Sequence, residues 1–117
     1  MMDRMALGRA SEDLATLEMI NRGYSIVARN QRDHGGEIDI VTRRGCELVF
    51  VEVRSRRGGQ PDDAADSIAD RKRAHVRGTA MRYLDARPVD YKEVRFFVIT
   101  VAWVDDSAKC TVIEDAF

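Results

Sequence analysis

Apolar side chains recur at intervals of three or four residues near the start of the chain, over residues 6–22. The positions concerned are Leu7, Ala10, Leu14, Leu17 and Ile20. This spacing puts them on one face of a helix, and Gly23 suits its C-terminal end because glycine adopts the left-handed conformation found there. The pattern therefore predicts an amphipathic helix with these five residues buried.

Three stretches with strand patterns follow. Residues 24–29 read YSIVAR and are followed by polar residues 30–33, which predict a turn. Residues 36–42, GEIDIVT, alternate strictly, which predicts Glu37, Asp39 and Val41 on one face and Ile38, Ile40 and Thr42 on the other. Residues 47–55, ELVFVEVRS, carry the strongest strand pattern, and the short connection at residues 43–45 predicts that they pair with residues 36–42 as a hairpin.

The second half of the chain predicts a loop at residues 57–63, a helix over residues 62–84, and strands over residues 94–104 and 110–113 joined by a turn at 105–107. The expected buried stripe of this helix is Ala65, Ile68, Ala69, Val76, Ala80, Tyr83 and Leu84. The order helix, three strands, helix, two strands predicts an α/β sandwich in which two helices cover one mixed sheet. Residues 1–117 are expected to form a single domain.

The amino-acid composition indicates which broad class of protein this is. With 44% hydrophobic and 33% charged residues, the chain has the make-up of a folded globular protein. The longest nearly apolar stretch, residues 96–104, is far shorter than the roughly 20 residues of a transmembrane helix, and the charged N-terminus lacks the apolar core of a secretory signal. We therefore expect no membrane association and a cytoplasmic location. Cys46 and Cys110 are expected to be free thiols, because no second cysteine lies near either in sequence.

Net charge is −1, so the bulk charge does not indicate a nucleic-acid-binding protein. The charge is unevenly distributed, however. Residues 29–82 carry twelve basic and nine acidic groups, a local excess of +3. The middle of the chain is therefore mildly basic.

Two carboxylates in this middle region are candidates for chemistry. Glu52 lies in the Val-rich strand 47–55, on the face expected to hold Leu48, Phe50, Arg54 and Arg56 rather than Val49, Val51, Val53 and Ser55. A carboxylate there is costly to bury alone, and the hairpin brings Asp39 of the preceding strand beside it. Two close carboxylates repel each other, and a hard divalent ion such as Mg²⁺ relieves the repulsion. The alternative is a surface salt-bridge network with Arg43, Arg54 or Arg56.

Several short sequence motifs resemble those of a known protein family. Residues 36–41, GEIDIV, are followed thirteen residues after Asp39 by Glu52 in the string VFVEVRSR of residues 49–56. Together they resemble the YraN-like uncharacterised protein family, which is similar to the PD-(D/E)XK restriction-endonuclease-like nucleases and, among those, to archaeal Holliday-junction resolvases. The resemblance extends over nearly the whole chain, through residues 8–15 (GRASEDLA), Asn30, Lys72, Arg95, Phe96 and the closing Ala116 and Phe117.

This resemblance implies a restriction-endonuclease-like αβββαββ fold and a nuclease site that uses Mg²⁺ or Mn²⁺. Asp39 and Glu52 take the positions of the motif's metal-binding acids, and Glu12 that of an additional acidic metal ligand. Arg54 takes the position of the motif's lysine as a catalytic residue, while Lys72 and Arg56 are expected to contact substrate phosphate. The implied partner is DNA, with branched DNA as one candidate substrate and a homodimer as the form suited to symmetric cuts.

Three residues depart from the family pattern. Arg54 stays protonated at ordinary pH, so it neutralises phosphate and cannot act as a neutral base. Phe97 stands where many relatives have aspartate, which puts an active-site or sheet-edge contact in doubt, and Ser11 stands where glycine is usual. The alternative function is therefore a catalytically silent module that binds nucleic acid or protein on the same fold.

Overall fold

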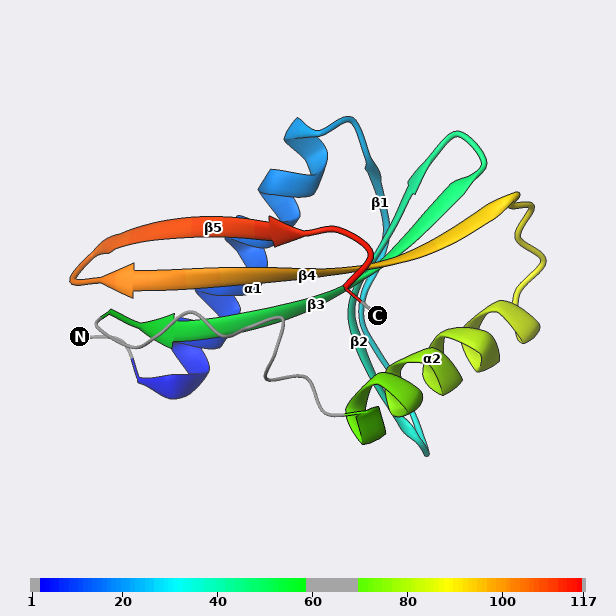
Figure 1. Cartoon of the computed structure of the whole chain (residues 1–117), viewed down its shortest axis with the longest axis horizontal. Helices are drawn as coiled ribbons and strands as arrows, with labels where there is room; N and C mark the ends of the chain where they lie inside the picture. Colours follow the sequence, from blue (N-terminus) through cyan, green and yellow to red (C-terminus); the bar gives the residue numbers. More distant parts are fainter. Residues whose placement is uncertain (1–2, 59–69, 117) are drawn as a thin grey trace.

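The computed structural model describes residues 3–58 and 70–116, without the side chains of residues 70–73. Its elements are α1 (Arg4–Asn21), β1 (Ser25–Asp33), β2 (Gly36–Arg44), β3 (Glu47–Arg57), α2 (Asp70–Asp85), β4 (Glu93–Val104) and β5 (Ser107–Ile113). The strands form one sheet in the order β1-β2-β3-β4-β5 (Figure 1), in which only the central pair β3 and β4 is parallel. The predicted αβββαββ order, the hairpin and the mixed sheet of a restriction-endonuclease-like fold are thus confirmed.

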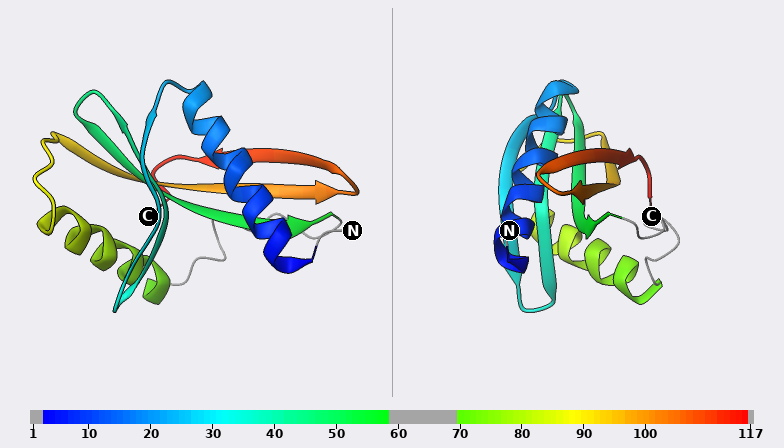
Figure 2. Two further views of the ribbon diagram at one scale, coloured as in Figure 1. Left: turned by 180° about the vertical axis from the view of Figure 1, so that it is seen from behind. Right: turned by 90° about the vertical axis from the view of Figure 1, so that its left-hand side faces the viewer.

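The two helices cover opposite faces of the sheet (Figure 2). On the α1 side, Val49 and Val51 of β3 pack in a cluster with Ala15 and Met19. On the α2 side, Leu48 and Phe50 pack in a second cluster. The alternation predicted for this strand is therefore confirmed, and both of its faces are apolar at the start of the strand because both are covered.

The buried face of α1 differs from the predicted one. Leu17 and Ile20 are about half exposed, at 54% and 47%, so their predicted burial is wrong. The buried residues are Leu7, Ser11, Ala15 and Met19, spaced four apart. Ser11 and Ala15 are completely buried, and their small side chains let the helix axis lie close to the sheet. Ala10 and Leu14 are partly buried at the edge of the cluster.

Ser11 has a specific partner, the indole of Trp103 on β4. The indole Nε1–H donates a hydrogen bond of 2.9 Å to the Ser11 hydroxyl in the buried interface between α1 and the sheet. Serine at this position therefore has a structural explanation, since a buried indole N–H needs an acceptor.

Ser11→Ala is expected to lower the free energy of unfolding by about 1–2 kcal/mol, because it leaves a buried donor unsatisfied. Urea denaturation followed by Trp103 fluorescence measures this loss. Ser25→Ala, at an exposed position of β1, is the control. Equal stability of Ser11→Ala and wild type would contradict the argument.

The turn between β1 and β2 lies later than predicted. Residues 30–33 belong to β1, and the chain reverses at His34 and Gly35, where the Asp33 carboxylate accepts the N–H groups of Gly35 and Gly36. Asp33 also accepts hydrogen bonds from Arg82 of α2, at 2.6 Å and 3.1 Å. A Cβ on Gly36 would lie 2.5 Å from the Thr79 hydroxyl, so glycine is required where the turn meets α2. The turn therefore holds α2 against the sheet.

On α2, burial of Val76, Ala80, Tyr83 and Leu84 is confirmed. The predictions for Ala65, Ile68 and Ala69, for the helix start at residue 62 and for most of the loop at 57–63 lie outside the described residues. Cys46 and Cys110 are free thiols, as predicted. Within residues 3–58 and 70–116, neither helix has the length and apolar character needed to cross a membrane.

Candidate functional site

The sheet divides at the two predicted carboxylates. The ladder between β2 and β3 ends with the pair Ile40 and Val51, so the next residues along the two strands are Asp39 and Glu52. Beyond this point β2 continues alongside β1 to Gly36, and β3 continues alongside β4 to Arg57. In Figure 1 the β1–β2 end turns downward, away from β3, β4 and β5, which extend to the left of the picture. We call this point, with Asp39 and Glu52 on its two sides, the strand fork.

At the strand fork, the Asp39 side chain takes the place of a backbone hydrogen-bond acceptor. Its Oδ2 accepts the N–H of Val53 at 2.7 Å, a donor that continuing sheet pairing would otherwise use. Burial and the nearby charge of Glu52 raise the pKa of Asp39 to about 7, against the opposing effect of the Val53 N–H. Glu12 and Glu37 raise it further. The structure thus brings Asp39 close to Glu52 and makes ionised Asp39 costly in the absence of a neutralising cation.

At the strand fork, the side chains of β2 do not follow the predicted alternation between the two faces of the sheet. Strict alternation predicts Ile38 and Ile40 on one side, but Ile40 packs in the α1 cluster and Ile38 in the α2 cluster, together with Val41. The prediction of strict alternation is therefore wrong at this point. The physical reason is that β2 separates from β3 between Ile38 and Ile40 and turns together with β1. The two isoleucines therefore pack on the sides of the sheet that different helices cover.

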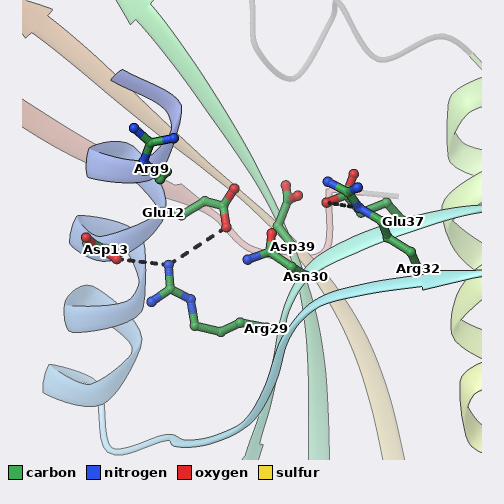
Figure 3. Close-up of a pocket in the computed structure, with 8 residues that line it drawn as sticks. All are labelled: Arg9, Glu12, Asp13, Arg29, Asn30, Arg32, Glu37 and Asp39. Atoms are coloured by element: carbon green, nitrogen blue, oxygen red, sulfur yellow. Dashed lines mark hydrogen bonds and ion pairs between the residues drawn. The ribbon is translucent and has the colours of Figure 1, made fainter. Parts of the chain in front are cut away.

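Asp39 opens into a pocket of about 670 Å³ between α1 and the β1–β2 hairpin. Figure 3 shows its lining residues, which are Arg9, Glu12, Asp13, Arg29, Asn30, Arg32, Glu37 and Asp39. Glu12 and Asp39 therefore share one pocket, although they come from α1 and β2. Glu52 is half-buried on β3 and is not among the residues that line it.

The Glu12 carboxylate is paired with Arg29 of β1. Arg29 Nη2 lies 3.8 Å from Glu12 Oε1 and 2.9 Å from Asp13 Oδ1. Burial raises the pKa of Glu12 above its ordinary value, and the nearby Arg29 and Asn30 side chains oppose that rise only in part. These two side chains favour the ionised carboxylate that a cation would require.

Of the predicted cationic residues, Arg54 and Arg56 are not among the described residues that line the pocket. Arg54 and Arg56 follow Glu52 on β3 and are both half-buried. Lys72 lies on α2, but its side chain is outside the described residues. The pocket instead contains Arg9, Arg29 and Arg32, which were not singled out as site residues from the sequence. A possible signal was the pair Arg29 and Asn30 within a strand whose neighbour carries Asp39.

Arg43, one of the three arginines that the salt-bridge alternative names, has its partners elsewhere. Arg43 donates to the carbonyl oxygens of Gly45 and Asp90, at 2.8 Å and 2.6 Å, at the opposite end of β2 from Asp39. Arg29 is the cation that joins acidic residues in the pocket, and it pairs with Glu12 and Asp13.

Phe97 lies on β4 opposite Val51, the residue before Glu52, and its side chain packs in the core on the α1 side of the sheet. It is 1% exposed and belongs to the α1-side core, where its ring meets Tyr24 edge-on at 6.2 Å. Arg95 lies over the same ring at 4.9 Å and bonds Glu47, Glu114 and Asp115. Phe97 therefore contributes to packing beside this ion-pair network.

The donor chemistry at the fork fits a hard cation. Asp39 keeps Oδ1 in addition to the oxygen that accepts Val53 N–H, and Glu52 adds a second carboxylate nearby. Within residues 3–58 and 70–116, no three His, Cys, Asp or Glu side chains are gathered as a ready-made metal cluster. Mg²⁺ is commonly held by one or two carboxylates, with water and substrate phosphate completing its shell. Binding of a metal by Asp39 and Glu52, with Glu12 as a third ligand, remains a prediction.

Comparison with known proteins identifies relatives over most of the chain. The model of uncharacterised protein family UPF0102 matches residues 11–101. A UPF0102 protein of Parafrankia sp. is 42% identical over 95 residues, which cover 81% of this chain and 80% of that protein. A UPF0102 protein of Moorella thermoacetica is 36% identical over 113 residues, covering 97% and 93%. One from Syntrophus aciditrophicus is 31% identical over 117 residues, covering 100% and 92%.

Proposed function

The chain belongs to uncharacterised protein family UPF0102, and from this membership and the strand fork we propose that it is a metal-dependent endonuclease that hydrolyses DNA phosphodiester bonds. One observation carries the proposal. Asp39 is held at the fork beside Glu52, and its pKa is raised to about 7 by burial and by that second carboxylate. Two carboxylates held this close, one of them with a raised pKa, are suited to bind a divalent cation.

In the proposed mechanism Asp39 and Glu52 hold Mg²⁺ or Mn²⁺, and Glu12 assists from α1. The bound ion would lower the pKa of water and polarise a phosphoryl oxygen. Arg54 lies two residues after Glu52 on β3 and carries a permanent charge, so its role is to neutralise phosphate. Arg56 and Lys72 have the same phosphate-binding role in the proposal.

The substrate class is DNA, with branched DNA as the first form to test because the sequence resembles the family of junction resolvases. A four-way junction has two equivalent strands to cut, so a homodimer would place two sites symmetrically. Arginine contacts to phosphate position a protein on DNA without reading its base sequence. We therefore propose selection by DNA shape.

The test is cleavage by purified protein of linear, single-stranded, flapped and four-way DNA, with Mg²⁺, with Mn²⁺ and with EDTA. We expect cleavage with either metal and none with EDTA. Glu52→Ala is expected to reduce the rate at least about 100-fold, since it removes one of two metal-binding carboxylates. Glu93→Ala is the matched control, because it removes an exposed glutamate at the start of β4.

Each other outcome distinguishes an alternative. Cleavage that persists in EDTA, or that Glu52→Ala retains, would contradict the proposed site. No cleavage by wild type, together with salt-sensitive DNA binding, would replace the nuclease with the catalytically silent binding module. Absence of both would leave a fold whose acidic residues serve another partner.

A further inference from the structure

Asn30 has an unusual backbone conformation for a residue inside a strand. Its φ angle is 53°, in the left-handed region, while β1 continues on both sides of it. The flanking pairs, Arg29 with Ile40 and Gln31 with Ile38, place Asn30 directly opposite Asp39. The Gln31 side chain donates to the Arg29 carbonyl at 3.1 Å and thereby spans the kink. Asparagine tolerates this conformation better than most residues, and such geometry gathers at functional sites.

The kink directs the Asn30 side chain into the pocket. Figure 3 shows it between Glu12 of α1 and Asp39 of β2. The nearby Asn30 side chain lowers the pKa of the Glu12 carboxyl, against the larger effect of burial. The residue is exposed, so burial in the core does not account for its conformation. Its side chain instead lies between Glu12 of α1 and Asp39 of β2.

We propose that Asn30 is a positioning residue of the candidate site, which holds the Glu12 carboxylate in place beside Asp39 so that α1 contributes to cation binding. The inference rests on the proposed function and deepens it, because it assigns a residue outside the acidic motif. Arg29 supports the same carboxylate from a distance of 3.8 Å but shares its charge with Asp13. Asn30 therefore supplies a neutral polar group between the two carboxylates, and Arg29 supplies the charge.

The left-handed backbone allows a variant that separates the two roles of Asn30. Glycine adopts positive φ without steric cost, so Asn30→Gly keeps the kink and removes the amide. Asp105→Gly is the matched control, because Asp105 has φ 54° in the turn between β4 and β5. Both variants introduce glycine at a position with positive φ, so the change in backbone conformational entropy is the same. Only Asn30→Gly alters the pocket.

The experiment measures the rise in melting temperature on titration with Mn²⁺ alone, and in parallel the cleavage rate and DNA affinity in EDTA. Asn30→Gly is expected to weaken Mn²⁺ binding and to lower the cleavage rate by roughly 10–100-fold, as removal of a residue supporting a metal ligand typically does. DNA affinity in EDTA is expected to stay within twofold of wild type. Asp105→Gly is expected to match wild type in all three.

A double-mutant cycle tests whether Asn30 acts through Glu12. In a Glu12→Gln background, Asn30→Gly is expected to produce little further loss of Mn²⁺ binding, whereas independent residues would give multiplicative losses. Wild-type Mn²⁺ binding by Asn30→Gly, or full additivity, would overturn the inference while leaving the proposed nuclease intact. If wild type itself neither binds Mn²⁺ nor cleaves DNA, the proposed function fails, and the role of Asn30 fails with it.

Discussion

Asp39→Asn is expected to abolish metal-dependent cleavage and yet to make the metal-free protein more stable at pH 8. The loss of cleavage follows because an amide replaces the charged ligand at the strand fork, and we expect a reduction of at least about 100-fold. The gain in stability follows because wild type must ionise a buried carboxylate beside Glu52. Asparagine keeps an oxygen that can accept the Val53 N–H. One substitution thus moves activity and stability in opposite directions.

The pH dependence has a defined sign. The pKa of Asp39 is about 7 in the folded protein, against an ordinary value of 3.8. Between these values the folded state retains a proton that the unfolded state releases, so wild-type stability falls as pH rises from about 4 to about 7. Asparagine does not titrate, and the expected advantage of the variant at pH 8 is on the order of 2–4 kcal/mol.

Urea denaturation of both proteins from pH 4 to pH 8, with and without Mn²⁺, measures this effect. Mn²⁺ is expected to stabilise wild type at pH 8 and to leave Asp39→Asn unchanged, because a ligand stabilises the state that binds it. Asp85→Asn, at an exposed position of α2, is the control for the loss of one negative charge. A variant less stable than wild type at pH 8 would show that Asp39 is stabilised as an anion by groups other than a metal.

Phe50→Ala is expected to cause a loss of about 3–5 kcal/mol in the free energy of unfolding, a large part of the stability of a small domain. Phe50 is 1% exposed on β3. Its ring stacks on Phe96 at 5.6 Å and meets Tyr83 of α2 edge-on at 6.0 Å. Removing it leaves a cavity in the α2-side cluster, between the sheet and the helix that carries Lys72.

Denaturation monitored by circular dichroism measures the loss for Phe50→Ala. Met81→Ala is the matched control, because Met81 is 50% exposed on the same helix and alanine favours helix. Hydrogen exchange of α2 amides adds a second measurement, in which protection is expected to fall in Phe50→Ala. A loss below about 1 kcal/mol would mean that the neighbouring side chains refill the space.

The proximity of Asp39 and Glu52 could be predicted from the local sequence. The other residues of the site are brought there by contacts between segments that are distant in the chain. A hairpin connection of a few residues is enough to bring those two carboxylates together, so their proximity followed from the strand pattern. The participation of Arg29, Asn30 and the pocket between α1 and β1 did not follow, because it depends on how a helix docks.

The strand patterns erred where residues respond to tertiary neighbours. The polar residues 30–33 predict a turn, but Asn30 takes positive φ and β1 continues along β2. Leu17 and Ile20 have helical spacing, but the buried face of α1 is the one on which Ser11 and Ala15 allow close approach. In both cases a local pattern permits more than one arrangement, and packing selects among them.

The sequence by itself determined the element order, the β2–β3 hairpin, the alternating faces of β3 and the proximity of Asp39 to Glu52. These features depend on periodicity and on short connections, which act between residues close in the chain. Only the tertiary structure decided where β2 leaves β3, which helix covers each side and which α1 residues meet the sheet. Those outcomes depend on burial and on hydrogen bonds between distant segments, such as that from Trp103 to Ser11, 92 residues apart.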